Sequence, residues 1–301
     1  MKLAGDVVVT GACGAIGSNL VRRILKEPEV TRIICIDNLS AGHHWLLPSD
    51  PRVEFHDDDI EMEDVIGGVD PPQRPVVFHL AAHFANQRSV EEPQLDTWVN
   101  VGGTVNMLEW AKAWKSPLFV FASAGCAAGH EDTPYQISKT AGEAYCRYYY
   151  PEVPTAVFRF HNSYGPGEVP GPYRNVIPKW MWSVLNGWPI TIFGDGYDRR
   201  DFVYVDDVVE RLVQAEPSSK PQEIGTGRLT EIGDLARTIE RVTGWPVTIE
   251  KGARRRWDHL GRPSVVEPRP FVALEDGIKR TWEWFRANED IIRESIQQKG
   301  E

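Results

Sequence analysis

The sequence predicts an α/β protein built on a doubly wound parallel sheet, with a smaller C-terminal α/β lobe. Short apolar runs alternate with helical patterns over residues 1–160, as expected when strands and helices take turns along the chain. The first run, residues 7–10, stops at a series of glycines, and the second, residues 32–36, stops at an acid. From about residue 166 the composition shifts to proline, glycine and aromatic residues, which marks the second lobe.

Composition and charge exclude several classes of protein. The 301 residues are 42% hydrophobic and 25% charged, which is ordinary for a globular chain with a large core. The net charge is −10 and no basic run exceeds residues 254–256, so a surface for nucleic acid or an anionic membrane is not expected. The four cysteines lack Cys-x-x-Cys spacing, and no long apolar span occurs. We therefore expect a soluble cytoplasmic protein without a disulfide framework or a zinc site.

A glycine turn lies between the first predicted strand and a helix. Gly11, Gly14 and Gly17 follow the strand at three-residue steps, and apolar residues at 20, 21, 24 and 25 mark one face of the helix. Gly11 permits the turn, Gly14 lets the backbone approach a pyrophosphate, and Gly17 lets the helix pack on the strand. Backbone N–H groups and the positive end of the helix dipole would bind the phosphates. The candidate cofactor contacts in this turn are Gly11, Cys13, Gly14, Ala15, Ile16 and Gly17.

Asp37 ends the second strand, 20 residues after Gly17. In a Rossmann-type sheet an acid at this place accepts hydrogen bonds from the adenosine ribose. A glycine turn with an unrelated surface aspartate is the alternative, but the strand, the spacing and the acid together favour a dinucleotide. Asp37 would repel a 2′-phosphate, and Asn38, Leu39 and Ser40 supply no cation. The sequence therefore predicts NAD rather than NADP, with Asn38 as a further contact.

The next two strand ends supply further candidates. Three acids follow the predicted strand at residues 52–56, where an open parallel sheet faces its ligand. A charge run is more often a solvated turn, but here Asp59 is the candidate partner of an adenine amino group, with Ile60 against the adenine ring. The strand at residues 75–82 ends in residues over which a flat ligand can lie close to the backbone: Leu80, Ala81 and Ala82.

His79 and His83 lie at the same strand end. Because no acid stands beside them at the spacing of metal ligands, we expect them to be structural, and no metal site is predicted.

A helix that opens at Thr133 carries Tyr135 and Lys139, which are four residues apart and therefore share one face. A nearby ammonium favours the phenolate and lowers the pKa of a tyrosine, which creates an acid/base group usable near neutral pH. Such a pair is common on helix surfaces. After a dinucleotide-binding half it predicts a catalytic pair.

Together these residues resemble the extended short-chain dehydrogenase/reductase family, in particular its NAD-dependent nucleotide-sugar epimerases and dehydratases of the UDP-glucose 4-epimerase type. The resemblance covers nearly the whole chain, and it is specific for the superfamily rather than for one reaction. The residues that carry it are Gly11-x-x-Gly14-x-x-Gly17, Asp37, Asp59-Ile60, His79-Leu80-Ala81-Ala82, Asn100, Tyr135-x-x-x-Lys139, Arg159-x-x-Asn162-x-Tyr164-Gly165-Pro166-Gly167, Gly194-x-Gly196 and Arg200-Asp201-Phe202-Val203-Tyr204-Val205-x-Asp207-Val208.

The resemblance implies a role for each matched residue. Tyr135 is expected to take a sugar hydroxyl proton while the C4 hydride moves to NAD, and Lys139 to bind the nicotinamide ribose and lower the pKa of Tyr135. Asn162 and Arg200 are expected to contact the substrate diphosphate. The remaining expected contacts are Asn100 for NAD, and Asn175, Val176 and Arg255 for the substrate.

Two stretches depart from the family pattern. The family has Ser or Thr, hydrogen-bonded to the sugar hydroxyl, where this chain has Ala124, which can neither donate nor accept. Ser123 is its neighbour and a candidate catalytic substitute, although adjacent strand residues point to opposite faces unless the strand is ending. Tyr135 follows by only 11 residues, so a trimmed loop and an open sugar pocket are expected. From residue 254 to 270 the family pattern is not recognisable, and Arg255 equally fits a solvated basic turn.

Three reactions of the family begin alike, by oxidation of C4 to a ketone. A 4,6-dehydratase carries Asp-Glu just after the strand-end Thr, and a decarboxylase usually has Glu there, but this chain has Gly125 and Cys126. An epimerase needs only the Tyr–Lys pair, the Ser or Thr, and room for the keto sugar to rotate. The resemblance therefore favours a UDP-sugar 4-epimerase with a transient 4-keto intermediate. The alternatives are a dehydratase or decarboxylase, and a protein that binds NAD and a nucleotide sugar without turnover.

The resemblance also implies two lobes and a dimer. Residues 1–165 are expected to bind NAD and to regain a segment at about 196–215, while residues 166–301 bind the nucleotide sugar. In the family, helices near residues 96–114 and 138–150 pair into a four-helix bundle, so a homodimer is expected; ordinary core is the alternative for their aromatic residues.

Overall fold

The computed structural model describes residues 2–62, 70–125, 132–255, 261, 263–266 and 270–298. The chain divides into two compact units. Unit 1 is Met1–Phe160 with Val209–Glu223, and unit 2 is His161–Val208 with Ile224–Glu301. Over the described ranges, none of the helices combines the length and the apolar character that crossing a membrane requires.

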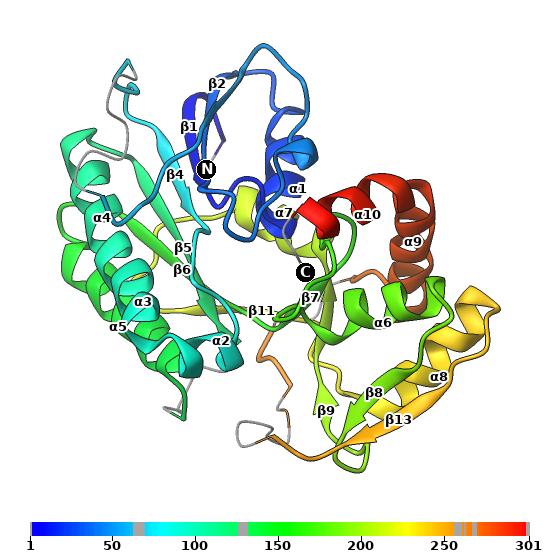
Figure 1. Ribbon diagram of the computed structural model, residues 1–301. Coiled ribbons are helices and arrows are strands. Elements are labelled where there is room, and N and C mark those ends of the chain that lie inside the picture. The colour runs from blue at the N-terminus through cyan, green and yellow to red at the C-terminus, as the bar shows by residue number, and fades with distance from the viewer. Residues whose placement is uncertain are drawn as a thin grey trace. The chain divides into compact units, whose positions relative to one another are not determined.

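A parallel sheet of seven strands forms the centre of unit 1 (Figure 1). Its order is β11-β6-β5-β4-β1-β2-β3, and the five neighbouring pairs from β6 to β3 all run parallel. The strand order reverses between β1 and β4, and open α/β sheets bind their ligands at such a point. The predicted Rossmann-type sheet is therefore confirmed. The strands are β1 (Gly5–Thr10), β2 (Val30–Ile36), β3 (Val53–His56), β4 (Val76–His79), β5 (Leu118–Ala124), β6 (Thr155–Phe160) and β11 (Gln222–Ile224).

Helices cover both faces of this sheet. Figure 1 shows α4 and α5 on one face and α1 on the other. The apolar face expected for α1 is buried, because Leu20, Val21 and Ile24 are inaccessible to solvent. The helices of unit 1 are α1 (Ala15–Ile24), η1 (His44–Leu46), α2 (Asn86–Glu91), α3 (Pro93–Thr97), η2 (Trp98–Gly102), α4 (Gly103–Ala113) and α5 (Pro134–Tyr149).

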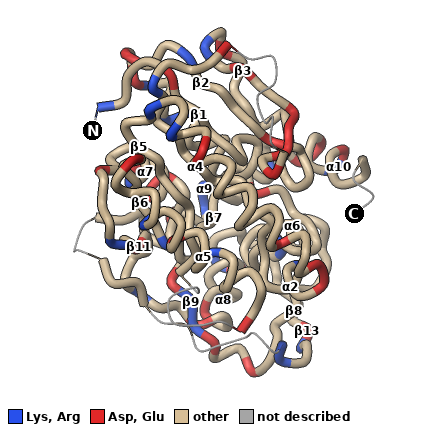
Figure 2. Tube along the Cα trace, turned by 90° about the vertical axis from the view of Figure 1, so that its left-hand side faces the viewer, with Lys and Arg blue, Asp and Glu red and all other residues tan. Residues whose placement is uncertain are grey.

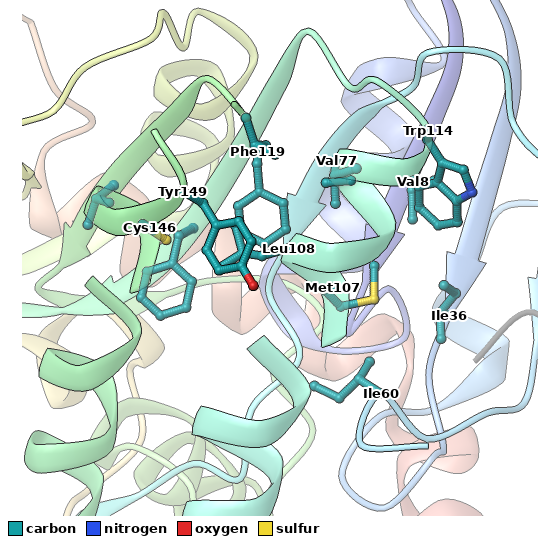
Figure 3. Packing of buried hydrophobic residues seen from close by; sticks show 14 of the residues in the cluster. Val8, Ile36, Ile60, Val77, Met107, Leu108, Trp114, Phe119, Cys146 and Tyr149 are labelled. Atoms are coloured by element: carbon teal, nitrogen blue, oxygen red, sulfur yellow. The ribbon is translucent and has the colours of Figure 1, made fainter. Parts of the chain in front are cut away.

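A hydrophobic core holds α4 and α5 to the sheet. Val8, Val77 and Phe119 from the strands pack with Met107 and Leu108 of α4, and Cys146 and Tyr149 of α5 join the same cluster (Figure 3). Most of these side chains are fully buried, and each such burial stabilises the fold by roughly 1.5–3 kcal/mol. The packing therefore fixes α5, the helix that carries Tyr135 and Lys139, against the sheet.

One predicted helix is interrupted. Residues 96–114 are expected to form a single helix, whereas the chain forms α3, a π-helical turn (η2) and α4 in succession. The wider turn carries Asn100 inward, where the side chain is 1% exposed and hydrogen-bonded to three other residues. Such turns often mark functional sites, because they re-aim one residue within a continuous helix.

Unit 2 consists of helices and three two-stranded ladders. β10 pairs with β7 and β13 with β8 in parallel, while β12 pairs with β9 in antiparallel fashion. Residues 196–208 stay in unit 2 because of the β10–β7 pairing, so the segment that rejoins unit 1 is Val209–Glu223 rather than about 196–215. The elements are β7 (Asn162–Tyr164), α6 (Val176–Leu185), β8 (Ile190–Phe193), β9 (Arg199–Arg200), β10 (Phe202–Tyr204), α7 (Val205–Val213, of which residues 209–213 belong to unit 1), β12 (Thr230–Glu231), α8 (Ile232–Thr243), β13 (Ile249–Gly252), α9 (Leu274–Ala287) and α10 (Glu289–Gln298).

Charged residues of both signs are interspersed along the chain. Figure 2 shows Lys and Arg next to Asp and Glu over most elements rather than gathered on one of them.

A chain of hydrogen bonds through His79 links β1, β4 and α4. The Thr104 hydroxyl donates to the Asn100 carbonyl at 2.7 Å, so it accepts from His79 Nε2 at 3.1 Å. His79 Nδ1 must then accept from the Thr10 hydroxyl at 2.8 Å, and that hydroxyl accepts from the Ala81 N–H at 3.1 Å. Only a neutral imidazole satisfies every partner in this chain. Burial, together with the Lys139 ammonium, lowers the pKa of His79 to about 3.

We expect this histidine to make the protein sensitive to acid. Its folded-state pKa lies below the usual 6.5, so its contribution to stability is complete above pH 6.5 and is lost as the pH falls toward 3. Between pH 7 and pH 5 the free energy of unfolding should drop by about 2 kcal/mol through this group alone. His79→Asn, which stays neutral, should remove that drop in urea unfolding. His44→Asn, at an exposed ring, should keep it. An equal pH dependence in His79→Asn and the parent would contradict the assignment.

Candidate active site

The glycine turn brings three pieces of backbone closer together than side chains permit. Gly11 has φ +67°, and a Cβ there would lie 2.7 Å from the Ala81 nitrogen. A Cβ on Gly17 would lie 2.1 Å from the Gly11 oxygen. Gly14 stands at the N-cap of α1, and no side chain caps that helix. The turn, Cys13, Ala15 and Ile16 thus form a backbone cradle at a helix N-terminus, which suits a pyrophosphate.

Asp37 is fixed to this turn by hydrogen bonds. Its Oδ2 accepts from the Cys13 N–H and its Oδ1 from the Leu39 N–H, both at 2.9 Å, and the residue is 8% exposed. Gly42 lies against the same group, because a Cβ on it would be 2.8 Å from both Asp37 Oδ1 and the Cys13 Cβ. The carboxylate is therefore held in one place at the end of β2, beside the phosphate cradle. This is the geometry that ribose recognition requires.

The predicted adenine contacts are only partly available. The Asn38 amide donates to the Asp59 carboxylate, which joins the ends of β2 and β3. Ile60, in contrast, is 4% exposed and packs in the core, where a Cβ on Gly103 would lie 2.6 Å from its Cδ1 (Figure 3). A side chain buried in this way does not fit the expectation that it faces an adenine ring. The Ile60 side chain packs in the core because Gly103 of α4 has no side chain to exclude it.

Asn100 supports the end of β4 rather than offering its side chain to a ligand. Its Oδ1 accepts from the His83 N–H at 2.9 Å, and its Nδ2 donates to the His83 carbonyl and to Asp96 Oδ1 at 2.9 Å and to Ser138 Oγ at 3.1 Å. Both ends of the amide are thus used within the protein. Asn100 thereby holds the backbone that follows Leu80, Ala81 and Ala82, and its contact with NAD stays a prediction.

Tyr135 and Lys139 lie together at the start of α5. Thr133 and Gln136 form a capping box that fixes the N-terminus of this helix. Lys139 is 3% exposed, and its Nζ lies 5.8 Å from the centre of the Tyr135 ring and 5.1 Å from that of Phe121. A buried ammonium at this place favours the phenolate form of the tyrosine. The pair can serve as an acid/base group near neutral pH.

The Ser123 side chain faces α5 and is hydrogen-bonded to Glu143 of that helix. Its hydroxyl donates to Glu143 at 2.6 Å, and Arg159 donates to both oxygens of the same carboxylate at 2.8 and 2.7 Å. A serine has one proton to donate. The structure therefore does not support Ser123 as a substitute for the missing hydroxyl. Ala124 points to the opposite side of the strand, as the alternation of strand residues requires. Cys126 lies outside the described residues.

In unit 2, Asp201 has a buried carboxylate and lies beside the two residues expected to bind a diphosphate, Asn162 and Arg200. Its oxygens accept from Thr226, Gly227 and Ser264, and the residue is 1% exposed. Its carbonyl accepts from both the backbone and the side-chain N–H of Asn162, at 3.0 and 3.2 Å. Arg200, the residue before it, is half-buried in β9. The Asp201 carbonyl thus holds Asn162, and Arg200 precedes Asp201 in the chain.

The start of α6 brings the other expected substrate contacts near one another. Asn175 is the N-cap of α6 and Val176 its first residue. The Arg255 guanidinium lies 4.4 Å from the centre of the Phe193 ring. Burial and the nearby Arg255 lower the pKa of Lys179, so two cations are held close together beside this helix end. Arg254 instead pairs with Asp198 at 2.9 Å, and Arg256 lies outside the described residues.

Three residues of these sites are absent from the sequence-based candidates. Glu143 stands eight residues after Tyr135, so the helical spacing that joins Tyr135 and Lys139 could have identified it. Asp201 stands within a motif that we used only for its arginine. Glu168, which contacts Asn175, directly follows the motif that ends at Gly167, but nothing in the sequence around it indicates that its side chain is buried. Within the described parts of the chain, no group of three His, Cys, Asp or Glu residues could hold a metal ion.

Comparisons with known proteins identify the family to which the chain is similar. The sequence model of the NAD dependent epimerase/dehydratase family matches residues 7–233. A UDP-glucose 4-epimerase of Mycolicibacterium smegmatis is 34% identical, covering 93% of this chain and 98% of that protein. A UDP-N-acetyl-alpha-D-glucosaminuronate decarboxylase of Bacillus cytotoxicus is 28% identical, covering 94% of this chain and 98% of that protein.

Solved structures are similar over nearly the whole chain. An epimerase from Methanothermobacter thermautotrophicus has a TM-score of 0.90 at 35% identity, covering 98% of this chain and 96% of its own. The UDP-glucose 4-epimerase of Thermotoga maritima, solved with UDP-glucose, has a TM-score of 0.87 at 31% identity, covering 94% of this chain and 99% of its own.

The contact between Gly42 and Asp37 predicts a test of the cofactor site. In Gly42→Ala the new methyl would press on the Asp37 carboxylate and on Cys13, so one of them must move. We expect the affinity for NAD to fall about tenfold, which is the loss of a single good hydrogen bond. Gly102→Ala is the matched control, because its Cβ would meet nothing within 4 Å. Calorimetric titration of NAD checks both variants. Unchanged affinity in a folded Gly42→Ala would refute the role of Asp37.

Proposed function

The chain belongs to the NAD dependent epimerase/dehydratase family, and we propose that within this family the protein is a 4-epimerase of UDP-sugars. The family is named for its cofactor, so the prediction of NAD from the glycine turn and Asp37 is confirmed. The resemblance to nucleotide-sugar epimerases and dehydratases is confirmed as well. The choice of one reaction, the UDP-sugar, the homodimer and the cytoplasmic location are proposals.

The observation that carries the proposal is the pair of a half-buried Tyr135 and a buried Lys139 on one face of α5. NAD, when bound, accepts and returns the hydride at C4 of the sugar. The chain itself must move one proton, from the 4-hydroxyl and back to it. Tyr135, beside a 3% exposed ammonium, is suited to that task, because the charge of Lys139 offsets the negative charge that the phenol acquires.

The absence of an acid next to β5 favours an epimerase over a dehydratase or a decarboxylase. Elimination of water from C5 and C6 needs carboxyl groups just after the strand-end Ser or Thr position, where this chain has Gly125 and Cys126. The Bacillus cytotoxicus decarboxylase is 28% identical to this chain, against 34% for the Mycolicibacterium smegmatis UDP-glucose 4-epimerase. A dehydratase or a decarboxylase remains the second candidate, because both share the first oxidation.

The substrate's diphosphate is proposed to bind in unit 2. The supporting observation is that burial and the nearby charge of Arg255 lower the pKa of Lys179, so a bound anion would offset the repulsion between these two cations. The N-terminus of α6, with Asn175 and Val176, adds backbone N–H groups and the positive end of a helix dipole. Asn162 keeps a second amide proton, since only one is needed for its bond to Asp201.

The direct test is NMR of the sugar at C4. A panel of UDP-sugars is incubated with the holoenzyme, and inversion at C4 without release of water or CO2 is expected. Tyr135→Phe should lower kcat about a hundredfold or more, because it removes the proton carrier. Release of water or CO2 without inversion would replace the proposal by a lyase. Binding of NAD and a UDP-sugar without any reaction would support the alternative of a protein that has lost turnover.

Ala124→Ser distinguishes a slow enzyme from one that needs no hydroxyl at this position. If the missing hydroxyl limits the reaction, restoring it should raise kcat at least about tenfold, as one hydrogen bond in the transition state can do. Ser123→Ala is the matched control. It should change kcat less than about threefold while lowering the free energy of unfolding by about 1 kcal/mol, because Glu143 loses a donor. An unchanged rate in Ala124→Ser would mean that Tyr135 works without a relay.

A further inference from the structure

Asn175 stands at the N-cap of α6 but does not cap it. Its side chain makes no hydrogen bond to the first turn of the helix. Instead its Nδ2 donates to Glu168 Oε1 at 3.1 Å, and its backbone N–H donates to the same carboxyl group. The third residue after the cap, Pro178, has no backbone N–H that could donate a hydrogen bond. The N–H groups of Val176 and Ile177 therefore remain the donors at this helix end that no side chain caps.

Glu168 is an acid held out of water. It is 5% exposed. The contacts that favour its charged form come from Arg174, in the loop before α6, and from the backbone and side-chain N–H groups of Asn175. Lys179, the cation on α6 itself, donates to the Pro172 carbonyl and faces Arg255. Burial outweighs these contacts and raises the pKa of Glu168 to about 7. Near neutral pH this carboxyl is thus present in both charge states.

We propose that Glu168 positions Asn175 at the nucleotide site, and that binding of a nucleoside diphosphate sugar there is coupled to uptake of a proton by the Glu168 carboxyl. This inference rests on the proposed function. It adds to it a positioning residue and a dependence on pH.

The coupling follows from the charges. A diphosphate at the start of α6 brings negative charge next to a carboxyl that is bonded to the N-cap residue. Like charges in a buried setting favour the neutral form of the acid, so the bound state holds the proton more tightly. A protonated Glu168 keeps a carbonyl oxygen as the acceptor for Asn175, so the position of Asn175 does not change. Affinity must then fall as the pH rises through 7, since binding takes up a proton.

The test is calorimetry with UDP-glucose as the probe. The NAD-loaded Tyr135→Phe variant is used, so that no sugar chemistry contributes heat. Titrations at pH 7.5 in two buffers of different ionisation enthalpy measure the protons exchanged, and a series from pH 6 to pH 8 measures affinity. We expect net proton uptake, and an affinity about five- to tenfold weaker at pH 8 than at pH 6. Adding Glu168→Gln, which stays neutral and keeps an acceptor, should abolish both effects. Adding Glu283→Gln, at an exposed residue of α9, should abolish neither.

Each outcome has one meaning. Proton uptake that disappears with Glu168→Gln supports the inference. Binding without proton exchange overturns it and leaves the proposed function intact, as does uptake that persists in Glu168→Gln. Failure of UDP-glucose to bind at any of these pH values overturns the proposed nucleotide class and the inference together. Glu168→Gln that binds no UDP-glucose although it unfolds at the parent temperature overturns the coupling, because a neutral residue should mimic the bound state.

Discussion

The whole first unit depends on how closely the backbone at the end of β1 can approach its neighbours. With a side chain on Gly11 or Gly17, the end of β4 and the start of α1 would have to move away. The same close approach lets the Cys13 N–H reach Asp37 at the end of β2. Three strand ends and one helix end thus meet at the point where the strand order reverses. That arrangement creates a site for a dinucleotide before any polar side chain other than Asp37 is counted.

The packing of α5 against the sheet fixes the positions of Tyr135, Lys139 and Glu143. A Cβ on Gly142 would lie 2.4 Å from the ring of Phe121, so this helix lies directly on β5. Tyr135, Lys139 and Glu143 occupy one face of it, and each has a different environment. Lys139 is buried beside aromatic rings, whereas Glu143 is neutralised by Arg159. Because Glu143 also accepts the hydrogen bond of Ser123, Tyr135 is the candidate among these three residues for the proposed acid/base work.

Where the structure gives a candidate residue a different environment from the one the sequence led us to expect, the reason lies in partners that come from distant parts of the chain. Ile60 was expected to face a ligand, but Gly103 leaves room for it in the core. Asn100 was expected to touch NAD, but His83, Asp96 and Ser138 use both ends of its amide. Ser123 was considered a substitute for the hydroxyl missing at Ala124, but Glu143 is its partner. Spacing along a strand or a helix predicts which face a residue occupies. It contains no information on which residues from other parts of the chain pack against that face.

The sequence by itself determined the sheet, the glycine turn, Asp37 with its preference for NAD, and the pair of Tyr135 and Lys139. These features depend on periodicity and on distances along the chain, because a turn, a strand end and one helical face are local. Only the tertiary structure decided that His79 is neutral, that the Asp201 carbonyl accepts from the Asn162 side chain, and that the Asn175 side chain donates to Glu168 instead of capping its helix. Protonation and hydrogen bonding depend on burial and on contacts between residues far apart in sequence, and the fold alone sets both.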